Sequence, residues 1–192
     1  MSESPSLNLP WSVKVSRLVL SIGAVIMRYS ALGRWIFTDS SIVKVPSSPD
    51  KPFMGVKSVD VTVDSTRKCW FRLFTPSPID HKSSDSMPLI FFFHGGGFSV
   101  GSPDNRYYDR FCRSLVQNLE AAVISVNYRL TPHHRWPCQY EDCFEVLRYF
   151  DENPIPELPM TANFKYSFLA GDSAGPPFVH MCSSHRGESQ SP

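Results

Sequence analysis

The sequence has almost no excess of charge of either sign and no apolar run long enough to cross a membrane. Lys and Arg number 19 and Asp and Glu 18, which gives a net charge of +1 without a dense basic run. This balance argues against a nucleic-acid-binding protein and favours a small molecule as the partner. The apolar stretch over 18–27 has ten residues, whereas a transmembrane helix needs about 20. We therefore expect no stable membrane span.

Cysteines are few, odd in number and scattered, and no Cys-x-x-Cys pair occurs. This pattern suggests neither a disulfide framework nor a zinc site. We expect no metal, no cofactor, no obligate protein partner and a reduced, cytoplasmic setting. The five cysteines are Cys69, Cys112, Cys138, Cys143 and Cys182.

The N-terminal segment has apolar residues at helical spacing on one face, with Lys14, Arg17 and Arg28 on the other. This pattern favours an amphipathic helix docked on the protein. The alternative is a signal peptide over 14–31. Ser and Pro are frequent over 39–52, which predicts a surface linker. Residues 1–50 are thus expected to be an N-terminal helix and a linker.

The rest of the chain up to residue 175 alternates strand and helix patterns. Two β-prone runs are expected to form an antiparallel pair, followed by a loop over 75–87. The continuously apolar run over 88–93 is typical of a strand buried on both faces of a parallel sheet. The run over 121–126 is expected to be another buried strand, and the run over 165–170 to be the next strand. The pattern predicts an α/β fold with a mainly parallel sheet and flanking helices. The expected strands span 56–63, 69–74, 88–93, 121–126 and 165–170, and the expected helices begin at Ser102 and Pro137, the second ending before Asn153.

Gly-Asp-Ser-Ala-Gly over 171–175 follows an expected strand and matches the pattern G-x-S-x-G. A serine on a tight turn between strand and helix exposes its Oγ, and small neighbours relieve crowding around the strained backbone. Ser173 is therefore a candidate nucleophile. Taken alone the motif is weak, because a serine between glycines is more often part of a turn or a helix cap.

His-Gly-Gly-Gly over 94–97 also follows an expected buried strand. Glycines let the backbone approach a ligand closely and point its N–H groups at a developing oxyanion. A flexible glycine loop and a phosphate cradle are the alternatives, but no Lys-Ser or Lys-Thr follows as in a P-loop. The two motifs, in this order and each after a strand, are far more specific together than either is alone.

With these motifs the chain resembles the α/β-hydrolase carboxylesterases of the hormone-sensitive-lipase type, most closely the plant carboxylesterases related to the gibberellin receptor. The residues that carry the resemblance are His-Gly-Gly-Gly-Phe over 94–98, Tyr-Arg-Leu-Thr-Pro-His-His-Arg-Trp-Pro over 128–137 and Gly-Asp-Ser-Ala-Gly over 171–175. Leu-Pro-Trp over 9–11 and the helix expected after it resemble the N-terminal lid of the family, so that residues 1–50 would be a lid helix and a linker. The resemblance runs from about Leu9 to Gly175. It implies that residues 51–175 are the N-terminal part of an α/β-hydrolase domain, an incomplete fold.

The resemblance also implies the roles of single residues. Ser173 would be the nucleophile of a carboxylic ester hydrolase that works through an acyl-serine, and Ala174, Gly95 and Gly96 would supply the N–H groups of the oxyanion hole. His94 would support the glycine loop, and would not act as the base. Supporting positions in the two motifs are Gly97, Gly171, Asp172 and Gly175, while Phe98, Tyr107 and Tyr108 would line an acyl pocket or belong to the core, and Arg129, Glu141 and Asp142 would brace the fold.

The family pattern ends after Gly175. In this fold the acid and then the histidine of the triad follow the serine along the chain, whereas residues 176–192 are expected to be a divergent, disordered tail. We therefore expect the chain to be truncated and its activity to be impaired, with the apolar strand over 165–170 left as a sheet edge. The alternatives are a non-catalytic, receptor-like protein that binds a small molecule and a non-functional truncated product.

Overall fold

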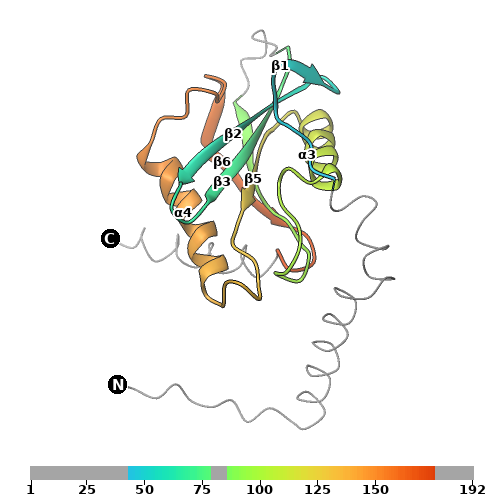
Figure 1. Ribbon diagram of the computed structural model, residues 1–192. Coiled ribbons are helices and arrows are strands. Elements are labelled where there is room, and N and C mark those ends of the chain that lie inside the picture. The colour runs from blue at the N-terminus through green and yellow to red at the C-terminus, as the bar shows by residue number, and fades with distance from the viewer. Residues whose placement is uncertain (1–42, 79–85, 176–192) are drawn as a thin grey trace. The chain divides into compact units, whose positions relative to one another are not determined.

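A computed structural model of the protein describes residues 43–78 and 86–175. The expected lid helix, its alternative as a signal peptide, and the tail over 176–192 lie outside these residues. Within them, six strands form one sheet in the order β1-β2-β3-β5-β4-β6 (Figure 1). The strands are β1 (Ser48–Phe53), β2 (Val56–Asp64), β3 (Cys69–Pro76), β4 (Met87–Phe93), β5 (Ala122–Asn127) and β6 (Ala162–Gly171).

The sheet is mixed, with a parallel half and an antiparallel half. Strand β4 pairs in parallel with both β5 and β6, whereas β1, β2 and β3 pair antiparallel and β3 pairs antiparallel with β5. The predicted antiparallel pair of β2 and β3 is confirmed. The prediction of a mainly parallel sheet is right only for β5, β4 and β6. Strands β1, β2 and β3 are joined by short turns, and strands joined by a short turn can pair only in the antiparallel direction.

Two helices cover the two faces of the sheet, α3 (Arg106–Leu119) and α4 (Cys138–Glu152) (Figure 1). Side chains along β4 alternate between the two cores: Leu89, Phe91 and Phe93 pack with α4, and Ile90 and Phe92 pack with α3. Burial on both faces explains why β4 is apolar throughout. Of the helices in the described part of the chain, neither is long and apolar enough to span a membrane.

The helix boundaries differ from expectation at one end. Helix α4 follows Pro137 and ends before Asn153, as predicted. Helix α3 begins at Arg106, not at Ser102, because the side chain of Asn105 caps it by accepting a hydrogen bond from Tyr107 N–H at 2.9 Å. Asparagine is among the best N-cap residues, so the helix begins after Asn105 and not after Ser102.

The predicted linker over 39–52 is wrong in its second half, where Ser48–Phe53 forms strand β1. Ser48 N–H donates to Ser58 Oγ at 2.9 Å, which fastens the strand to β2. The prolines that suggested a loop are tolerated because β1 lies at the edge of the sheet, where one side of the backbone needs no partner.

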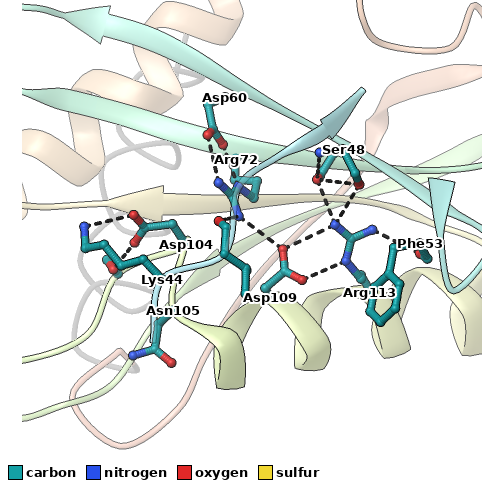
Figure 2. Close-up of polar contacts among 12 residues, drawn as sticks. Lys44, Ser48, Phe53, Asp60, Arg72, Asp104, Asn105, Asp109 and Arg113 are labelled. Carbon is teal, nitrogen blue, oxygen red and sulfur yellow. Dashed lines mark hydrogen bonds and ion pairs between the residues drawn. The ribbon is translucent and has the colours of Figure 1, made fainter. Parts of the chain in front are cut away.

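A buried ion-pair cluster joins α3 to the antiparallel half of the sheet (Figure 2). Asp109 on α3 accepts from Arg72 of β3 at 3.2 Å and from Arg113 at 2.8 Å. Arg113 also donates to the carbonyl oxygens of Phe53 and Val56, which flank the turn between β1 and β2. The cluster therefore fixes β1, β2 and β3 against one helix.

Candidate active site

Ser173 stands on a sharp turn directly after β6. The strand ends at Gly171, and Ser173 has a φ of +49°, in the left-handed region that residues with a side chain rarely adopt. The turn is closed by a hydrogen bond from Gly175 N–H to the carbonyl oxygen of Asp172 at 2.7 Å. Ser173 is exposed to solvent. A strained backbone that presents a hydroxyl is the geometry that G-x-S-x-G predicts.

Gly175 allows this turn to pack against the end of β4. A Cβ atom at this position would lie 2.2 Å from the carbonyl oxygen of Phe93. No side chain fits at that distance, so the glycine is required by close approach of two backbones. The turn around Ser173 is thereby held at the carboxyl end of the neighbouring strand.

The glycine loop leaves β4 at the same end of the sheet. Gly96 has a φ of +109°, and its carbonyl oxygen accepts hydrogen bonds from Ser99 N–H at 3.0 Å and Val100 N–H at 3.1 Å. A Cβ at Gly96 would lie 2.1 Å from Val100 O, so both conformation and space demand glycine. The loop is therefore a hydrogen-bonded turn and not a flexible segment.

The loop and the serine turn meet because β4 and β6 are parallel neighbours, with Phe93 opposite Gly171. Gly95 contacts the serine turn: a Cβ placed on it would lie 3.0 Å from Ser173 Cβ. Gly95 N–H donates to Asp172 Oδ1 at 2.5 Å, so this N–H is engaged by a carboxylate. Within the described part of the chain, the N–H groups of Gly96 and Ala174 have no hydrogen-bond partner.

His94 is buried under the glycine loop. Its Nδ1 lies 2.8 Å from Gly95 O, its ring stacks on Tyr128 with centroids 4.2 Å apart, and Tyr128 Oη donates to His94 O at 2.5 Å. Burial lowers the pKa of His94 to about 4. These contacts agree with a supporting role for the imidazole. Among the residues that the structure describes, Ser173 Oγ has no hydrogen bond to a histidine.

A contact between Asp172 and Tyr108 was not predicted from the sequence. Tyr108 Oη donates to Asp172 Oδ2 at 3.2 Å across 64 positions of sequence. Its side chain is buried between Phe92 and His94, and burial raises the pKa of the phenol, so the O–H stays a donor. Tyr108 thus belongs to the core, one of the two expected roles. No local pattern identifies such a contact, because helical spacing places Tyr108 only on an apolar face.

The loop after β5 contains the predicted brace. Asp142 is fully buried and accepts from Arg129 Nε and Nη2, both at 2.8 Å, and from the backbone N–H of Arg129 at 2.9 Å. Glu141 lies 3.5 Å from Arg129 and is exposed. His133 and His134 are exposed. The bracing role of Arg129 and Asp142 is confirmed.

The cysteines that the structure describes are buried free thiols. Burial raises the pKa of Cys69 and of Cys112 to about 12, which keeps both protonated and unreactive at neutral pH. No group of metal-ligating side chains occurs in residues 43–78 and 86–175.

Comparison with known families gives a match over residues 90–192 to a family with the α/β-hydrolase fold. The match includes residues 176–192, which were expected from the sequence to be a divergent tail. Carboxylesterase 20 of Arabidopsis thaliana is 35% identical over 67% of this chain and 41% of its own length. Gibberellin receptor GID1C of the same plant is 35% identical over 71% of this chain and 42% of its own length.

Solved structures agree on the fold. A thermostable esterase from Pseudomonas putida superposes with a TM-score of 0.64 at 18% identity, over 98% of this chain and 56% of that protein. A Pyrobaculum calidifontis esterase superposes with a TM-score of 0.57 at 23% identity, over 93% of this chain and 50% of that protein. The chain spans about two fifths of the length of the two plant relatives and about half of these solved structures.

Proposed function

The chain belongs to the α/β-hydrolase family, and we propose that it carries the nucleophile and oxyanion half of a carboxylic ester hydrolase site. The observation that supports this most directly is the juxtaposition of a strained, exposed Ser173 with a glycine loop whose Gly96 N–H lacks a partner among the described residues. The substrate is a small carboxylic ester. The similarity to plant carboxylesterases and to esterases of solved structure agrees with this class.

Each residue has a defined task in the proposed reaction. Ser173 Oγ attacks the ester carbonyl and becomes acylated, the alcohol leaves with a proton, and water then releases the acid. The N–H groups of Gly96 and Ala174 stabilise the oxyanion, since Gly95 N–H is held by Asp172. His94 is buried with a low pKa and supports the loop.

We expect hydrolysis by this chain to be slow. A serine hydroxyl needs a base to take its proton, and Ser173 has no histidine partner in the described part of the chain. Removing a triad member typically lowers the rate by about 10⁴- to 10⁶-fold. The remaining hydrolysis would come from unassisted attack by Ser173 Oγ, with the oxyanion stabilised by the N–H groups of Gly96 and Ala174.

A second function, binding of a small molecule without catalysis, is favoured by the similarity to gibberellin receptors of Arabidopsis thaliana. The same site would then hold a ligand without acylation of the serine. His94, the glycines after it, and Ala174 beside Ser173 follow the esterase pattern. This is why we place hydrolysis first.

Hydrolysis of p-nitrophenyl acetate by the 192-residue chain, by Ser173→Ala and by Ser114→Ala tests the proposal. Ser114 is a half-buried serine on α3 whose hydroxyl bonds its own helix, so it is a control outside the candidate site. We expect saturable release of p-nitrophenol by the wild type and by Ser114→Ala, and none above background by Ser173→Ala. Equal rates in all three proteins contradict the proposal. Saturable binding of the ester without turnover favours the second function.

A further inference from the structure

Three segments of the chain meet at the side chain of Asp172. Its Oδ1 accepts from Gly95 N–H at 2.5 Å, and its Oδ2 accepts from Tyr108 Oη at 3.2 Å. Gly95 belongs to the loop after β4, Tyr108 to α3, and Asp172 to the turn after β6. One carboxylate therefore joins the glycine loop, a helix and the serine turn.

We propose that Asp172 is the positioning residue of the glycine loop, whose carboxylate holds Gly95 N–H in place and is itself held by Tyr108. The N–H of Gly95 is then engaged by the carboxylate, while the N–H of Gly96 has no partner among the described residues. The catalytic meaning of this arrangement rests on the proposed ester hydrolysis. The hydrogen bonds themselves do not depend on it.

The hydrogen bond from Gly95 N–H to the Asp172 carboxylate is a charge-assisted one. A hydrogen bond between a backbone N–H and an ionised carboxylate is about twice as strong as a neutral one. Gly95 is buried, so its N–H would have no solvent partner if the carboxylate were removed, and an unpaired buried N–H is costly. The loop would then shift to find another acceptor, and the Gly96 N–H would move with it.

Tyr108 fixes the other oxygen of the carboxylate. Its ring is buried against the rings of Phe92 and His94, with centroids 6.1 and 5.3 Å away. The hydroxyl is therefore held at one position, and the carboxylate can turn away from Gly95 only by losing this second donor. This contact is what distinguishes a positioning network from a carboxylate that only closes its own turn.

Amide hydrogen exchange at Gly95, measured by NMR on the full 192-residue chain at one pH, tests the inference without reference to activity. In Asp172→Ala we expect Gly95 to exchange about tenfold faster or more, because its acceptor is gone. In Asp172→Asn the side-chain oxygen still accepts, so exchange is rescued to within about threefold of the wild type. In Tyr108→Phe we expect a smaller acceleration, since the carboxylate remains and loses one of its two donors.

The amides of Val123 and Ile124 in β5 report whether the fold is intact, and Asp50→Ala, which removes an exposed carboxylate of β1, is the matched control with no expected change at Gly95. An unchanged Gly95 rate in Asp172→Ala overturns the inference, as does equal acceleration in Asp172→Asn and Asp172→Ala. If Asp172→Ala also loses protection in β5, Tyr108→Phe decides: faster exchange at Gly95 alone supports the inference, and an unchanged rate overturns it. If the serine assay fails and the exchange rates are as expected, only the proposed hydrolysis is contradicted. If the serine assay succeeds and the exchange rates are not as expected, only the positioning role of Asp172 is contradicted.

Discussion

The burial of His94, next to the candidate site, makes the stability of the fold depend on pH. The imidazole is fully buried, and burial lowers its pKa from 6.5 to about 4. The folded protein thus holds His94 neutral where the unfolded chain would protonate it. Because the unfolded state binds the proton first, protonation favours unfolding as the pH falls.

We expect the free energy of unfolding to fall as the pH drops from about 6.5 to about 4, by up to about 3 kcal/mol from His94 alone. Above this window the contribution is constant. Urea denaturation of the wild type and of His94→Gln at several pH values measures it, because glutamine does not titrate. The variant should show a shallower dependence on pH. The same slope in both proteins would show that His94 does not titrate in this range.

Among the larger elements, helix α3 has two distinct attachments to the sheet. Its apolar face packs on Ile90 and Phe92 of β4, and its Asp109 joins Arg72 and Arg113 in the buried cluster of Figure 2. Both arginine side chains are at most 2% exposed. A buried charge that loses its partner is strongly destabilising, since water cannot replace the lost carboxylate.

Asp109→Ala should lower the free energy of unfolding by about 3–5 kcal/mol, because it leaves Arg113 buried without a carboxylate. Urea denaturation followed by circular dichroism measures the change. Asp50→Ala, which removes an exposed carboxylate from β1, should alter stability by no more than about 0.5 kcal/mol. Equal effects of the two substitutions would mean that the cluster adds no stability.

For the molecule as a whole, the notable feature is strand β6. It is the last strand in the order of the described sheet and pairs with β4 on one side. Its Tyr166 and Phe168 side chains are 55% and 57% exposed. An apolar edge strand is a template for pairing with another chain, which agrees with the apolar edge expected from the sequence for residues 165–170.

We expect the 192-residue chain to self-associate through β6 of a second copy as its concentration rises. Phe168→Lys should raise the protein concentration at which the chain self-associates by roughly tenfold. The substitution removes a phenylalanine side chain that would be buried between the two copies, and it places two like charges at their contact. Size-exclusion chromatography with light scattering over a range of concentrations measures this. Leu119→Lys, at an exposed apolar position of α3, is the control and should have little effect. A monomer at every concentration would contradict the prediction.

The features that could be predicted from the sequence are those with local causes. Apolar runs identified β4 and β5, which are buried on both faces. A mixed run with apolar residues identified β6, although Tyr166 and Phe168 of that strand are exposed. The glycine motifs identified both turns because backbone conformation and close packing there exclude side chains at Gly96 and Gly175. The three errors, in the linker over 39–52, the start of α3 and the direction of several strands, concern positions where local signals compete or where pairing partners decide.

Apart from the pair of β2 and β3, local pattern could not reveal which strands are neighbours. Only the order β5-β4-β6 brings the ends of β4 and β6 together, so that Gly95 touches the serine turn and Asp172 reaches both Gly95 N–H and Tyr108. The ion pair between Arg72 and Asp109 likewise joins residues far apart in the chain. The backbone conformation of a turn is determined by the few residues that form it, so it can be predicted from the sequence. Contacts between distant segments depend on which strands become neighbours when the sheet is assembled, so they require the tertiary structure.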